Sequence, residues 1–116
     1  MGRAQLLALI GLASLVACKE TTIDDRSCPP EGTKLTYDNF GKAFMESHCQ
    51  RCHGSADNRN GAPEAYDFGR VEDVRRYKAR IFSRAAADNT TMPPGPDDPP
   101  ERDREQLAEW LVCGAP

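Results

Sequence analysis

The residues best suited to chemistry are two cysteines and a histidine within five positions, Cys49, Cys52 and His53, in the order C-x-x-C-H. On a helical turn, positions i, i+3 and i+4 lie on one face. Both thiols can then reach the two vinyl groups along one side of a porphyrin, while the imidazole reaches the iron. This is the pattern of c-type haem attachment. It predicts one covalently bound haem c, with His53 as an axial ligand of the iron.

The same motif has two other known uses. A dithiol redox motif is expected within a βαβ pattern, and no such pattern surrounds Cys49 and Cys52. A zinc site would need two further ligands. Haem is therefore the favoured interpretation.

A sixth iron ligand has to come from the opposite side of the haem. Met92 is the candidate, because it lies far beyond His53 in a proline-stiffened stretch, residues 91–96, that cannot be helical. Met45 lies too close to the proximal turn. His48 directly precedes Cys49 and is interpreted as a solvated or capping side chain. The predicted axial set is His53 and Met92.

Three helices are expected to position these residues. The first is capped by Thr36 or Asp38 and runs into the haem motif at residue 49. The second covers residues 71–87, where apolar side chains recur three or four apart. The third begins at the prolines of positions 99 and 100 and ends near Gly114. No segment alternates with period two, so the predicted fold is an all-α domain.

Apolar side chains of these helices are expected to bury the haem. They are Phe40, Phe44, Ile81, Phe82, Leu107 and Trp110.

The amino-terminal residues 1–17 have the pattern of a signal peptide, with Arg3 followed by a short apolar run. That run is too short and too interrupted for a membrane span. Residues 15–18 (LVAC) resemble the lipobox of bacterial lipoproteins, in which the thiol of the cysteine, here Cys18, is lipidated. Ordinary secretory cleavage nearby is the alternative. Lys19 after the cysteine favours the outer membrane over the inner membrane.

Composition limits the remaining possibilities. The chain has 116 residues and a net charge of −3, which suits one small domain. The acidic balance argues against a nucleic-acid partner. The expected organisation is a signal peptide at residues 1–17, a flexible tether at residues 18–35 and a haem-binding domain at residues 36–116.

The capped helix before the C-x-x-C-H motif, the Met92 loop and a last helix bearing Trp110 resemble class I c-type cytochromes of the small bacterial lipoprotein kind. The likeness spans roughly residues 35–116. It implies a helical cytochrome c-like domain whose first and last helices cross near one haem edge, and electron transfer as the activity. Cys113 is a departure, because ordinary members lack a cysteine there.

Cys28 and Cys113 remain when Cys18 carries lipid and the motif cysteines carry haem. An oxidising compartment favours pairing two such thiols. We therefore expect a Cys28–Cys113 disulfide, and two independent thiols are the alternative.

With both axial positions filled, the favoured function is a lipid-anchored, periplasm-facing electron carrier that serves redox partner proteins. One rival is a peroxidase-like or gas-sensing protein in which Met92 dissociates. The other is a structural lipoprotein without haem. Partner docking could use the basic side chains of residues 70–84 or the acidic stretch of residues 97–105.

Overall fold

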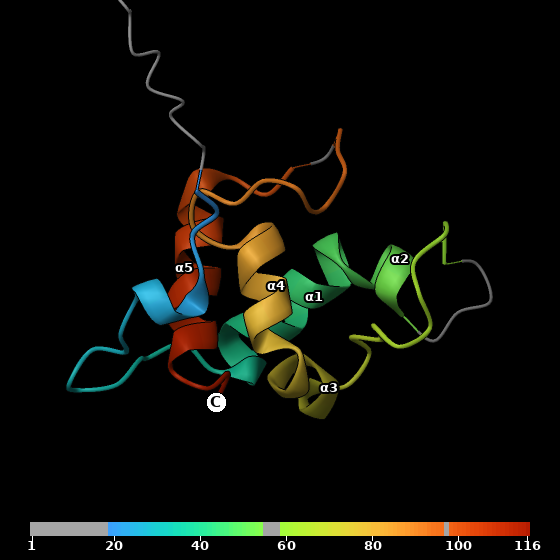
Figure 1. Cartoon of the computed structure of the whole chain (residues 1–116). Helices are drawn as coiled ribbons and strands as arrows, with labels where there is room; N and C mark the ends of the chain where they lie inside the picture. The colour runs from blue at the N-terminus through green and yellow to red at the C-terminus, as the bar shows by residue number, and fades with distance from the viewer. Residues whose placement is uncertain (1–18, 55–58, 97) are drawn as a thin grey trace, which may run out of the picture.

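The structure, a computed structural model, describes residues 19–54, 59–96 and 98–116 and contains helices and loops, with no strand in those ranges. The all-α prediction is confirmed (Figure 1). No helix in the described ranges is long and apolar enough to cross a membrane. The elements are η1 (Ile23–Asp25), η2 (Tyr37–Gly41), α1 (Lys42–His48), α2 (Gln50–His53), α3 (Val71–Arg76), α4 (Lys78–Ala85) and α5 (Glu101–Val112).

The first helical unit, η2 followed by α1, begins at the predicted cap. The Thr36 hydroxyl accepts a hydrogen bond from the Asn39 amide at 3.1 Å, and the Asn39 side chain accepts one from the Thr36 amide at 2.7 Å. This reciprocal pair satisfies two amide donors that the helix start leaves free. Gly41 then lies directly against the Trp110 ring, where a β-carbon would overlap it. The first and last helical units therefore cross in close contact at this glycine.

The helix expected over residues 71–87 is divided into α3 and α4 at Tyr77. Tyr77 has φ −102° and ψ 15°, outside the helical range. Its ring packs against Tyr66 and Phe68, with centroids 5.1 and 6.4 Å away. Tyr66 and Phe68 lie in the loop before α3, outside the helical pattern of residues 71–87. The periodicity of that pattern alone could therefore not locate the break.

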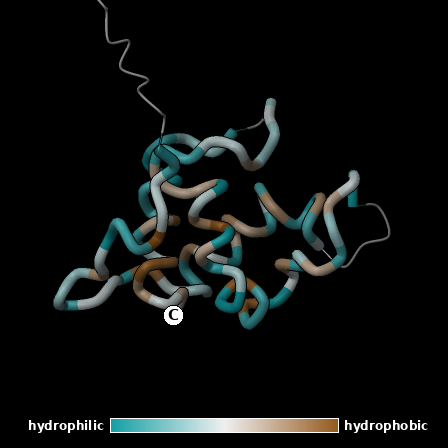
Figure 2. The backbone as a smooth tube through the Cα atoms, in the orientation of Figure 1, coloured by the Kyte–Doolittle hydropathy of each residue, from teal (hydrophilic) through white to brown (hydrophobic). Residues whose placement is uncertain are grey.

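Helix α5 follows Pro100 and matches the predicted last helix, except that it ends two residues earlier, at Val112. It packs mainly against α4. Its apolar side chains Leu107, Trp110 and Leu111 have no exposed surface. They form the centre of the core. Figure 2 shows the most hydrophobic stretches toward the middle of the molecule and hydrophilic ones along the outer loops.

The amino-terminal segment differs from the expected flexible tether, because the described part of it packs on the helices. Arg26 forms a two-pronged ion pair with Glu105 of α5, at 2.6 and 3.0 Å. The Asn89 side chain donates to the Thr21 carbonyl at 2.7 Å. Residues 1–17 and Cys18, the expected signal peptide and lipidation site, lie outside the described residues.

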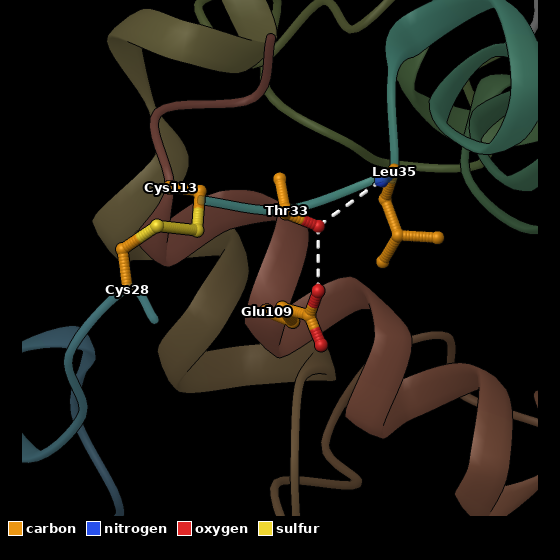
Figure 3. Close-up of a disulfide and its surroundings, with 5 residues drawn as sticks. All are labelled: Cys28, Thr33, Leu35, Glu109 and Cys113. Carbon is orange, nitrogen blue, oxygen red and sulfur yellow. Dashed lines mark hydrogen bonds between the residues drawn. A yellow bond between two sulfur atoms is a disulfide. The ribbon is translucent and has the colours of Figure 1, made fainter. Parts of the chain in front are cut away.

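A disulfide joins Cys28 to Cys113 just beyond α5 (Figure 3). This is the pair expected from the sequence. Beside it the Thr33 hydroxyl donates to Glu109 at 2.5 Å and accepts from the Leu35 amide at 3.0 Å. The segment is thus attached covalently and by hydrogen bonds to the carboxyl-terminal half of α5.

Candidate functional site

One cleft brings together all four residues predicted to hold the cofactor. It has a cavity volume of about 230 Å³ and is partly open to solvent. Most of its lining is apolar, contributed by Ala62, Pro63, Phe68, Ile81, Ala85, Pro93 and Pro94. Cys49, Cys52, His53 and Met92 also line it.

The haem motif forms the end of the first helical unit. Helix α1 ends at His48, and after Cys49, at φ −118° and ψ −43°, the chain makes the single turn α2. Amide hydrogen bonds continue through the junction, from Cys49 to Met45 at 2.9 Å and from His53 to Cys49 at 2.8 Å. The two thiols and the imidazole consequently line one cleft, as the i, i+3, i+4 spacing predicts.

The His53 ring is oriented by backbone contacts. Its Nδ1 lies 2.8 Å from the Tyr66 carbonyl oxygen. A carbonyl can only accept, so Nδ1 carries the proton and Nε2 keeps the lone pair that binds a metal. The Phe68 ring packs on the imidazole with centroids 4.9 Å apart, and the Phe68 amide donates to the His53 carbonyl at 2.6 Å.

Cys49 and Cys52 are both free thiols. Burial raises the pKa of the Cys49 thiol to about 12, and the charge of Arg104 acts in the opposite direction. The sulfur is therefore uncharged at neutral pH.

Met92 reaches the cleft from a loop. Its side chain is 39% exposed and is the exposed large hydrophobic residue of the described ranges. The Met92 thioether lies at the wall of an apolar cleft that an imidazole and two thiols also line. This placement suits a second axial ligand of a haem. The Met92 amide donates to the Arg84 carbonyl at 2.8 Å, so the backbone of this residue is fixed although no helix surrounds it.

Of the six apolar residues expected to bury the cofactor, Ile81 lines the cleft. Together with Ile81, the side chains of Phe44, Phe82, Leu107 and Trp110 form part of the buried core, and Phe40 packs against it partly buried. The helical pattern identifies a buried face without telling core from cofactor pocket.

His48 also lines the cleft, with its ring against Phe44 at 4.9 Å between centroids. This position at the wall of the cleft differs from the solvated or capping role that the sequence predicted for His48.

Three features of the site were missed by sequence reasoning. The Tyr66 carbonyl and the Phe68 ring support His53 from a loop of no regular structure. Arg104 is buried, at 3% exposure, and contacts the Met92 loop. The first two carry no sequence signal, whereas Arg104 lies three and four positions before Leu107 and Ala108, on the buried face of α5, and this spacing could have identified it.

The family profile described as cytochrome C oxidase, cbb3-type, subunit III matches residues 39–111. The matched range begins in the first helical unit, ends in α5 and includes both the C-x-x-C-H motif and Met92. No curated protein and no solved structure matches the chain. The matched range covers well over half of the chain, which therefore belongs to this family and is a c-type cytochrome.

Proposed function

We propose that this chain is a lipid-anchored cytochrome with one covalent haem c, which passes single electrons between redox partner proteins on the periplasmic side of a bacterial membrane. One observation carries the proposal. An imidazole with its Nδ1 engaged, two free thiols and a thioether line the same apolar cleft.

Each of these residues has a defined task in the proposal. Cys49 and Cys52 would bind the haem covalently, and His53 and Met92 would ligate its iron. When bound, the haem supplies a one-electron ferric/ferrous couple. A thioether ligand favours the reduced state relative to a second histidine, so Met92 raises the reduction potential. The apolar lining excludes water and acts in the same direction.

The surroundings of Met92 favour an electron carrier over an enzyme. Peroxidase-like chemistry would need a proton donor or acceptor beside the axial position that Met92 vacates. Met92 is followed directly by Pro93 and Pro94, which have no side chain able to move a proton, and the imidazole of His48, which also lines the cleft, belongs to the helical unit that carries Cys49 and His53. The opening of the cleft to solvent leaves a route for an electron to a docked partner. Arg80 and Arg84 line that cleft and favour a partner with acidic groups.

The attachment to the membrane rests on Cys18. If Cys18 carries lipid, the first described contact with a helix follows only two residues later, where Glu20 lies 4.0 Å from Arg84 of α4. Two residues span at most about 7 Å. The anchor would thus hold the domain close to the membrane surface.

The test is the visible spectrum of the chain matured in a host that exports proteins and attaches haem c. We expect colour that survives acid extraction, sharp bands on reduction and a ferric methionine-to-iron charge-transfer band. A high-spin spectrum that shifts with carbon monoxide would support the sensor or peroxidase-like reading. A colourless protein from such a host would contradict the proposal. Cys18→Ser should move the coloured protein from the membrane to the soluble periplasmic fraction.

A further inference from the structure

Arg104 of α5 is the most unusual charged residue of the described chain. Its side chain is 3% exposed, whereas arginines are rarely so deeply buried without a function for their charge or hydrogen bonds. Its neighbours on the helix, Arg102 and Glu105, are exposed. A hydrophobic residue at position 104 would suit the helix–helix contact, so the burial of a guanidinium requires an explanation.

The guanidinium is directed at the chain that leads from α4 to Met92. Its Nη1 lies 2.8 Å from the Ala85 carbonyl oxygen, 3.0 Å from that of Asn89 and 2.9 Å from that of Met92. Two N–H groups are shared among three acceptors. The carbonyl of Arg104 itself accepts from the Ala87 amide at 3.0 Å.

The other nitrogen, Nη2, faces the far end of the same loop. It has no hydrogen-bond partner and lies 3.7 Å from Asp98 Oδ1. The Arg104 side chain therefore contacts the loop at three places: before Met92, at Met92 and after Met92. In Figure 1 the chain beyond α4 extends away from the helices and returns to the start of α5, and Arg104 lies in the first turns of that helix.

The loop needs such support. Ala87 adopts φ +55°, a left-handed conformation that costs free energy for a residue other than glycine. Residues 91–96 form no helix whose hydrogen bonds would hold Met92. The Met92 amide bond to Arg84 fixes one side of the residue, and the Arg104 bond to the Met92 carbonyl fixes the other.

We propose that Arg104 is a positioning residue for the axial methionine: it holds the backbone of the Met92 loop so that the thioether stays at the iron. This inference rests on the proposed haem function. The positive charge, which reaches the Cys49 thiol, also disfavours the extra positive charge of ferric iron. Its removal should therefore lower the reduction potential even where Met92 remains bound.

The experiment compares Arg104→Gln and Arg104→Lys with Arg102→Gln, a matched control on an exposed part of the same helix. In Arg104→Gln we expect a weaker methionine-to-iron band and at least tenfold tighter binding of imidazole to ferric iron, about 1.4 kcal/mol. Lysine keeps the charge, but its nitrogen is one bond closer to the backbone than Nη1 of arginine, so Arg104→Lys should restore part of the potential and little of the methionine band. Arg102→Gln should match the wild type in both.

A haem-independent measurement separates this inference from the proposed function. Amide hydrogen exchange at Ala87 and Met92 should accelerate at least tenfold in Arg104→Gln, with the amides of α1 unchanged. If the wild type shows no methionine-to-iron band, the proposed function fails while exchange still reports whether Arg104 holds the loop. If Arg104→Gln unfolds, Asp98→Asn, which changes an exposed side chain, should show the same effects more weakly. An unchanged band, imidazole affinity within twofold and unchanged exchange would overturn the inference.

Discussion

The two sides of the haem cleft are held in different ways. His53 lies in a helical turn that directly continues the first helical unit, and its ring contacts Tyr66, 13 positions further along the chain, and Phe68 beside it. Met92 lies in a loop, 39% exposed, and its backbone is held by Arg84 and by Arg104 of the last helix. The strong nitrogen ligand is thus carried by a hydrogen-bonded helical turn, and the weak thioether ligand by a loop that contacts of two helices, α4 and α5, hold in place.

The difference indicates which side can be changed independently. Hydrogen bonds within a helical turn form with that turn, whereas the Met92 loop depends on the packing of α4 against α5. Disturbance of α5 should therefore loosen the Met92 side before it affects the His53 side.

The largest effect is expected on the His53 side. In the double variant Cys49→Ser, Cys52→Ser, we expect complete loss of covalent haem, because neither side chain can then form a thioether. Haem staining of the denatured protein measures this. The double variant Cys28→Ser, Cys113→Ser is the control, and it should keep its haem. Haem lost equally from both would show that the disulfide and the motif cannot be separated.

The second-largest effect is expected when Met92 alone is changed. Met92→Ala should abolish the methionine-to-iron band and lower the reduction potential by at least 59 mV, a tenfold change in the ferrous-to-ferric ratio. Stability without haem should change little, because the side chain is exposed. Met45, with no exposed surface, provides the matched control: Met45→Ala should cost about 2 to 5 kcal/mol of stability and leave the band in place. An unaltered spectrum in Met92→Ala would remove Met92 from the ligand set.

Removal of the disulfide tests a region that lies outside both the His53 side and the Met92 side of the cleft. Cys28 and Cys113 are 85 positions apart in sequence, and closing so long a loop stabilises the fold by about 4 kcal/mol on the chain-entropy argument. We expect Cys28→Ser with Cys113→Ser to lower the free energy of unfolding by an amount of that order. The spectrum of the folded protein should stay the same. A lost methionine band would show that the Met92 loop depends on the carboxyl-terminal end of α5 as well as on its start.

Gly41→Ala should lower stability less than removal of the disulfide does, and it sharpens the contrast between the two sides. The new β-carbon overlaps the Trp110 ring, so α5 has to move, at a cost of about 1 to 3 kcal/mol. Ser47→Ala, at an exposed position of α1, should stay within about 0.5 kcal/mol of the wild type. The methionine band should weaken while covalent haem is retained. Equal loss of both would mean that the two sides are not independently held.

The sequence by itself determined the local features of this protein. The spacing of Cys49, Cys52 and His53 specifies a helical turn with one reactive face. Thr36 and Pro100 mark the starts of the first and last helices, and consecutive prolines exclude a helix around Met92. All of these depend on residues within about one turn of one another, which is the range over which helix caps, proline and side-chain periodicity act.

The tertiary structure decided what depends on distant residues. The aromatic contacts of Tyr77 divided a helix that periodicity predicted as one. Packing placed Phe82, Trp110 and Ile81 together in the core, and of these three Ile81 also lines the cleft. The Arg26–Glu105 pair and the Cys28–Cys113 bond attached a segment whose composition is typical of a tether. The burial of Arg104 beside the Met92 loop follows from the packing of α4 against α5. No residue pattern within either helix determines which backbone carbonyls this packing brings to the Arg104 side chain.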